Sequence, residues 1–306
     1  MQGYIGKRIG MSILSLFMLV TVAFFLTRMM PGSPFQNGNV SEDILRSMEK
    51  EYGLDKPVTE QYQTYLKNLL HGNLGVSFKK PEVTVTEVIV RTWPITASLG
   101  GLAILTAALF GTVFGIWQAS SKRFIVKGGI FLGTMLGTGI PNFVVGLLLM
   151  LFFGVRLKLF PIAGLTSPQS YILPVISLAV YPSAVIARLV QNTFRVEMER
   201  DYVTMARAKG IGFRQTALTH ILKNAWIPVL NYLGPAAAFL LTGSFVVESI
   251  FTIPGLGREF VNSIGNRDYT MILGLTVFMG ITVIVINLFT DLLSAWLDPR
   301  IRRSLR

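Results

Sequence analysis

The sequence predicts an all-α integral membrane protein. Hydrophobic residues make up 51% of the 306 residues and charged residues only 14%, whereas an ordinary soluble domain has roughly 25% charged residues. The mean hydropathy is +0.55, and long apolar runs recur along the whole chain. These observations place most of the chain in a lipid bilayer.

Six apolar runs are long enough to cross a bilayer. A helix rises 1.5 Å per residue, so a hydrocarbon core of roughly 30 Å requires about 20 residues. The runs lie near residues 9–27, 95–120, 125–155, 173–190, 227–250 and 271–296. The third run is too long for one straight helix. We expect it to bend at Pro141, because proline removes a helix hydrogen bond.

The positions of lysine and arginine predict the orientation. With a cytoplasmic N-terminus, the cytoplasmic segments hold 16 of the 28 Lys and Arg residues and 5 of the 16 Asp and Glu residues, as the positive-inside rule requires. Both termini are then cytoplasmic. Insertion in the lipid bilayer explains the net charge of +12, so no nucleic-acid partner is expected.

The segment between the first and second runs differs from the rest of the chain. It is polar and contains turn signals at PGSPF and NGN, followed by two stretches with helical periodicity. We expect a small extracytoplasmic helical segment, which could be a lid on the spans or a docking platform. The predicted organisation is a first transmembrane helix (1–28), this segment (29–94), a five-helix core (95–296) with a cytoplasmic loop (193–226), and a basic cytoplasmic tail (297–306).

The sequence lacks the signatures of the commonest enzyme sites. It has no cysteine, and His71 and His220 are far apart. No phosphate loop, zinc-protease helix or serine-hydrolase elbow is present. We therefore expect no catalytic residue, metal or cofactor on this chain. Arg188, Glu248 and Asp291 fall near the ends of the predicted spans, which argues against ion-coupled transport, since that requires ionisable groups at depth.

A basic segment at residues 202–230 interrupts the apolar runs. Residues 202–209 predict a short helix in which small alanines alternate with Arg207 and Lys209, and Gly210 provides a stop because glycine accepts a positive φ. A second helix begins near Phe213. Such a segment suits insertion into a groove of a soluble partner. It equally suits a helix lying on anionic lipid, and the pattern alone does not decide between them.

Several stretches resemble type I ABC importer permeases of the dipeptide, oligopeptide and nickel branch. They are TMARAKG with HILKNAWIPVL, PGSPF, YGLDKPVTEQYQTYLKNLLHGNLGVSF, GIPNFVVGLLL, GSFVVESIFTIPGLGREFVNSIGNRDYTMILG and DLLSAWLDPRIR. They run over nearly the whole chain, and the pattern is most similar to the first of the two permeases of oligopeptide importers. One departure is that Thr204, Met205 and Ala206 stand where the general signature has Glu-Ala-Ala.

The resemblance implies a permease subunit for peptides, in the cell membrane of a prokaryote, that alternates between inward-open and outward-open states. Its partners would be a second homologous permease, two cytoplasmic ATPase subunits that bind ATP and Mg, and an extracytoplasmic substrate-binding protein. A nickel or metallophore importer of the same branch is one alternative, and an energy-independent channel or scaffold is another. The residues that would contact the ATPase are Tyr202, Thr204, Ala206, Arg207, Ala208, Lys209, Gly210 and Phe213.

Two further groups of residues are candidates for the transport pathway. The outer turn FTIPGLGREF holds Pro254, Gly255, Gly257 and Arg258, which could form an external gate or contact the binding protein, or be an ordinary turn. Asn142, Asn231 and Asn287 are polar groups within spans. They could line a pathway, or they could join helices through hydrogen bonds.

Overall fold

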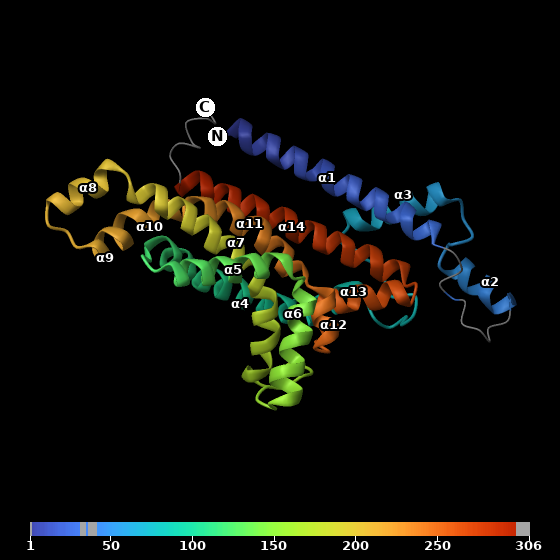
Figure 1. Ribbon diagram of the computed structural model, residues 1–306. Helices are drawn as coiled ribbons and strands as arrows, with labels where there is room; N and C mark the ends of the chain where they lie inside the picture. Colours follow the sequence, from blue (N-terminus) through green and yellow to red (C-terminus); the bar gives the residue numbers. More distant parts are fainter. Residues whose placement is uncertain (1, 31–34, 36–41, 298–306) are drawn as a thin grey trace.

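The computed structural model describes residues 2–30, 35 and 42–297. These residues form a helical bundle (Figure 1), with a single β-bridge, between Val76 and Thr84, in the described part. The turn sequences at 31–34 and 36–41 and the basic tail after Leu297 lie outside the described residues. The prediction of an all-α membrane protein is confirmed.

The elements follow one another as helices joined mostly by short connections. They are α1 (Gln2–Met29), α2 (Glu42–Glu51), α3 (Val58–Leu70), α4 (Val85–Ser120), α5 (Phe124–Gly139), α6 (Asn142–Leu149), the π-helix η1 (Met150–Arg156), the 3-10 helix η2 (Pro168–Tyr171), α7 (Ile172–Met198), α8 (Asp201–Ala208), α9 (Phe213–Thr216), the π-helix η3 (Ala217–Ile221), α10 (Leu222–Ala225), α11 (Ile227–Thr242), α12 (Phe245–Ile250), α13 (Leu256–Gly265) and α14 (Tyr269–Leu297).

Five stretches of helix are long and apolar enough to cross a membrane. They are Arg8–Met29, Val85–Ser120, Pro168–Met198, Ile227–Ile250 and Tyr269–Leu292. A sixth span results if α5 and α6 with η1 are counted together, although the pair is bent by 108°. The bend lies at the expected Pro141, directly before α6. Figure 1 shows that α6, η1 and the first part of α7 extend sideways from the bundle.

Small residues bring α4 and α7 into close contact. Alanine and glycine recur every four residues on α4, at Ala103, Ala107, Gly111 and Gly115, and form one face of the helix. A Cβ atom added at Gly115 would lie 2.7 Å from the Ala187 carbonyl oxygen. Backbones can approach this closely only through small residues, which is the usual way that helices associate in membranes.

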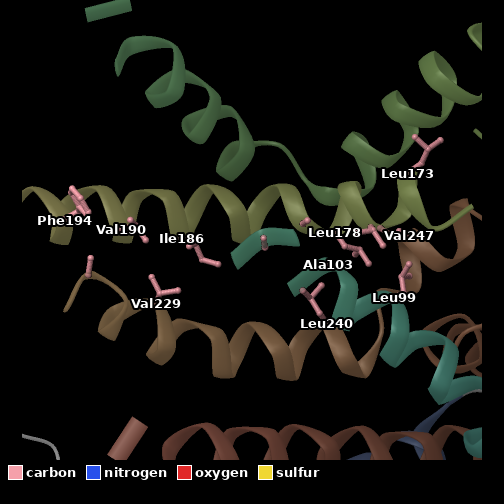
Figure 2. Packing of buried hydrophobic residues seen from close by; sticks show 14 of the residues in the cluster. Leu99, Ala103, Leu173, Leu178, Ile186, Val190, Phe194, Val229, Leu240 and Val247 are labelled. Carbon is pink, nitrogen blue, oxygen red and sulfur yellow. The ribbon is translucent and has the colours of Figure 1, made fainter. Parts of the chain in front are cut away.

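The main core lies where α7, α4 and α11 meet. Ile186, Val190 and Phe194 stand four residues apart on α7 and are fully buried. Figure 2 shows Ile186 and Val190 on the side of α7 that faces α11, where Val229 and Leu240 lie. This face therefore binds α7 to the bundle and leaves the opposite face of α7 outside the main core.

The first helix packs against the outside of the bundle. Arg8 of α1 forms an ion pair with Asp291 of α14. Near the other end of α1, the hydroxyl groups of Thr21 and Tyr62 are 2.6 Å apart, and Phe24 stacks on Tyr65 with ring centroids 5.7 Å apart. The contacts with Tyr62 and Tyr65 show that the segment before α4 packs on a span through α3.

Two helices extend beyond the expected ends of their spans. α4 begins at Val85, where Thr84 caps it by accepting a hydrogen bond from the Glu87 backbone N–H, and the helix continues through Pro94. The boundary expected at residue 94 thus falls inside a helix. α7 continues to Met198, so Arg188 does not lie near the end of its helix, contrary to the expectation from the sequence.

Candidate functional site

The connection between α7 and α11 forms a separate structure at one end of the bundle. Figure 1 shows α8 and α9 projecting beyond the spans, at the end opposite to α12 and α13. This connection contains every residue expected to contact an ATPase. Its helices are short, so their positions depend on the contacts described below.

Helix α8 ends in the way that the sequence predicts. Gly210 has φ +78°, a value that costs glycine little and other residues more. The N–H of Gly210 donates to the Arg207 carbonyl (2.9 Å) and the N–H of Ile211 to the Ala206 carbonyl (3.1 Å). These bonds close the last turn of α8 and redirect the chain toward α9.

Glu197, at the end of α7, holds this connection in place. Its Oε2 accepts hydrogen bonds from the Tyr202 hydroxyl (2.7 Å) and from the Asn224 amide (3.0 Å). Arg200 Nε lies 3.8 Å from Glu197 Oε1. One carboxylate therefore joins the start of α8 to α10. Burial and the hydrogen bond to Glu197 raise the pKa of Tyr202 above its usual value.

The predicted contact residues divide into an inner and an outer set. Ala206 is buried and Tyr202 is half-buried, because both face the bundle. The others are exposed to solvent: Thr204, Arg207, Ala208, Lys209, Gly210 and Phe213. A Cβ atom added at Gly210 would have no atom within 4 Å. The exposed set therefore forms a surface that another protein can reach.

A groove runs along the connection between α8 and α10. It has a volume of about 650 Å³ and is lined by Tyr202, Met205, Ala206, Lys209, Ile211, Thr219, His220, Lys223 and Asn224. Two lysines and a histidine stand among apolar side chains. Sequence reasoning found α8 but missed Glu197 and Asn224, because hydrogen bonds between the ends of different helices leave no periodic signal.

The turn at the opposite end is built around a buried carboxylate. Glu248 is fully buried, and it accepts hydrogen bonds from the Thr96 hydroxyl (3.0 Å) and the Arg258 backbone N–H (2.9 Å). A Cβ atom added at Gly255 would lie 2.6 Å from the Glu248 carboxyl carbon. Glycine is therefore needed there to let the backbone approach this side chain.

The four residues expected at an external gate differ in their exposure. Pro254 is exposed and Arg258 is half-buried, whereas Gly255 and Gly257 are buried against Glu248. The two glycines thus shape the turn and do not present a surface. Glu248 was missed as part of this site because its position near the end of an apolar run does not show what surrounds it.

The three candidate pathway asparagines do not come together. Asn231 and Asn287 line a cavity of about 350 Å³ beside the Arg8–Asp291 ion pair. Asn142 lines a different cavity, of about 310 Å³, together with Tyr181, Pro182 and Tyr232. Within the described residues, no three His, Asp or Glu side chains lie close enough to hold a metal ion.

Family models match almost the whole chain. The model described as binding-protein-dependent transport system inner membrane component matches residues 111–303. The model for the N-terminal part of such membrane components matches residues 1–100.

Full-length relatives include named permeases of several bacteria. The chain is 38% identical over 302 residues to the dipeptide transport system permease protein DppB of Lactococcus lactis, covering 99% of this chain and all of the relative. It is 39% identical to DppB of Bacillus subtilis, covering 99% and 98%. It is 37% identical to the oligopeptide transport system permease protein OppB of Salmonella typhimurium, covering 99% and 100%.

Solved structures share the fold of the central helices. An inward-facing MetNI methionine ABC transporter matches with a TM-score of 0.57 at 17% identity, over 69% of this chain and 96% of that one. An amino acid ABC transporter matches with a TM-score of 0.53 at 19% identity, over 69% and 94%. The sequence matches and the shared fold agree, and the chain therefore belongs to the family of inner membrane components of binding-protein-dependent transport systems.

Proposed function

We propose that this chain is the transmembrane permease subunit of an ATP-binding-cassette importer for peptides. The observation that carries the proposal is the match to dipeptide and oligopeptide permeases over 99% of the chain. The chain forms the translocation pathway together with a second, related permease. ATP and Mg bind to two partner ATPase subunits, and an extracytoplasmic binding protein delivers the peptide.

The exposed surface of α8 is the contact with the ATPase in this proposal. Thr204, Ala208 and Lys209 are exposed at a projecting end of the bundle. A short helix with small side chains can enter a groove on a soluble partner without steric conflict. The connection then lies in the cytoplasm, as do both termini, and the turn between α12 and α13 lies outside.

Transmission through α8 requires a difference in affinity between two states. A ligand shifts an equilibrium only by as much as its affinities for the two states differ. ATP favours the closed ATPase dimer, and the closed dimer holds α8 in the position of the outward-open permease. Glu197 joins α8 to the ends of α7 and α10, so a displacement of α8 moves both helices.

Affinity co-purification in mild detergent tests the proposal. The wild-type chain should retain a sibling permease and two nucleotide-binding subunits, identified by mass spectrometry. Ala208→Asp places a charge on the exposed surface of α8 and should release the ATPases while the sibling remains. Ala163→Asp is the matched control, because Ala163 is also exposed but lies in the connection between η1 and η2.

The outcomes separate the importer from the other classes. Loss of the ATPases from Ala208→Asp alone supports docking through α8. If the wild-type chain retains no ATPase under conditions that keep other importers assembled, the importer proposal fails and an energy-independent channel or scaffold is favoured. If both variants keep the ATPases, α8 is not the contact.

A further inference from the structure

Arg188 is a positive charge on α7, within the stretch Pro168–Met198 that is long and apolar enough to cross a membrane. It lies ten residues before the end of α7, about 15 Å along the helix axis. Its Nη2 donates a hydrogen bond to the Thr138 hydroxyl (3.2 Å). Thr138 stands just before the break between α5 and α6, so the guanidinium reaches the middle of the bent span.

The guanidinium of Arg188 has few partners within the chain. The hydrogen bond to Thr138 uses one of its five N–H donors. Its Nε is buried and has no hydrogen-bond partner. Among the residues that the structure describes, no carboxylate forms an ion pair with it. A charged group within a membrane-spanning segment normally pairs with another charge or faces a water-filled path.

The face of α7 that carries Arg188 lies outside the main core and is only partly polar, because Ala184, one turn earlier, is buried beside Gly137 of α5. Arg188 stands two positions from both Ile186 and Val190, on the opposite side of the helix. Tyr181, two turns earlier, and Asn192, one turn later, share its face and are exposed. Tyr181 also lines the cavity of about 310 Å³ that contains Asn142 and Tyr232.

The broken span beside Arg188 is a further sign of a binding site. In secondary transporters, substrate sites are commonly formed where a spanning helix is interrupted near the middle of the membrane, and the broken span here has the same form. α6 begins at the break, next to Pro141, and the first turn of a helix carries partial positive charge. The break and Arg188 both favour an anionic ligand.

We infer that Arg188 binds the C-terminal carboxylate of a peptide during its passage through the permease. The inference rests on the proposed peptide-import function. Arginine suits this role because its planar fork donates two parallel hydrogen bonds to a carboxylate. Thr138 orients the fork, and the face with Tyr181 and Asn192 lines the route.

Charge rescue at this position tests the inference. The chain has no cysteine, so Arg188→Cys introduces a single thiol into this subunit. The intact importer is reconstituted in liposomes with its binding protein, and the uptake of radiolabelled trialanine is measured before and after treatment with a positively charged 2-aminoethyl or a negatively charged 2-sulfonatoethyl thiosulfonate. Wild-type importer treated in the same way corrects for cysteines in the partners.

We expect Arg188→Cys and Arg188→Gln to reduce uptake at saturating peptide by about tenfold, the order expected for a hydrogen bond to a charged group. The aminoethyl reagent should restore much of the uptake, the sulfonate should not, and Arg188→Lys should lose less than Arg188→Gln. Arg91→Gln is the matched control, because Arg91 is exposed near the other end of the bundle, on α4, and it should transport at the wild-type rate.

Other outcomes would overturn the inference. Wild-type uptake by Arg188→Gln excludes a role in transport. Loss of the sibling permease from Arg188→Gln or Arg188→Cys on co-purification means that the arginine pairs with that subunit instead. A thiol that reacts with neither reagent in any nucleotide state lies outside the route. If one of these results is found while the wild-type importer still takes up trialanine with ATP, only the inference about Arg188 fails. If the wild-type importer shows no ATP-dependent uptake, the proposed function itself is contradicted.

Discussion

Removing the buried carboxylate of Glu248 should loosen the turn between α12 and α13. Its two oxygens accept hydrogen bonds from the Thr96 hydroxyl and the Arg258 backbone N–H. The Thr96 hydroxyl oxygen in turn accepts from the Leu256 N–H (2.8 Å). These bonds connect α12, the start of α13 and α4, so one side chain determines how the turn sits on the bundle.

The structure gives the expected size of the effect. Glu248→Ala leaves the buried Thr96 hydroxyl and the partly buried Arg258 N–H without this acceptor, and each unsatisfied group costs about 1–3 kcal/mol. The free energy of unfolding should therefore fall by about 2–6 kcal/mol. Glu248→Gln keeps one carbonyl oxygen and should lose about 1–3 kcal/mol. The double variant with Thr96→Val should lose less than the sum, because the two changes remove one shared hydrogen bond.

Thermal stability of the purified importer in detergent measures this effect. The monodisperse fraction after heating gives an apparent Tm, and each kcal/mol should lower it by roughly 2–4 °C for a chain of this size. Glu82→Ala is the matched control, because Glu82 is exposed just before α4. Equal stability of Glu248→Ala and Glu82→Ala would refute the reasoning, and so would a full loss in Glu248→Gln.

Three further predictions concern other contacts. Gly115→Ala places a Cβ 2.7 Å from Val190 Cβ and should cost about 1–3 kcal/mol of stability, whereas Gly101→Ala, with no atom within 4 Å, should not. Burial raises the pKa of Tyr65 to about 12, so the contribution of Tyr65 to stability is complete below about pH 10 and is lost as the pH rises toward 12. Tyr65→Phe should lack this loss when its Tm is compared with that of the wild type between pH 9 and 12. An identical pH dependence of the two proteins would contradict the assignment. Glu197→Ala removes two hydrogen bonds to the connection, so α8 should be released and trypsin should cleave at Arg207 and Lys209 about ten times faster. Glu199→Ala, at an exposed position, is the control. Equal cleavage rates for the two variants would count against Glu197 as the anchor.

The sequence is informative where a single local rule decides the structure. The apolar runs locate the spans because length and hydropathy alone determine whether a helix can cross a bilayer. Gly210 predicts the end of α8, and Pro141 predicts the bend, because each residue has a restricted or unusual backbone preference. These features depend on neighbours along the chain and not on tertiary packing.

Contacts between distant segments explain what the sequence missed. The apolar run was expected to begin at residue 95, yet α4 begins at Val85 and passes through Pro94, since helices in membranes tolerate proline. Glu248 is 152 positions from Thr96, and Glu197 is 27 positions from Asn224. Helical periodicity therefore does not show that these two carboxylates connect separate helices. The three asparagines were grouped by residue type alone, and the arrangement of the helices separates them into two cavities.

The ratio of ATP hydrolysed to peptide imported tests the central claim most directly. Gly210→Val and Gly72→Val introduce the same side chain at exposed glycines with φ of +78° and +74° and no atom within 4 Å, so both carry a similar strain of about 1–2 kcal/mol. Only Gly210 adjoins α8, whereas Gly72 follows α3. If α8 transmits ATPase closure, Gly210→Val hydrolyses several times more ATP per peptide than Gly72→Val in the reconstituted importer. Equal ratios for the two variants at equal assembly would contradict coupling through α8.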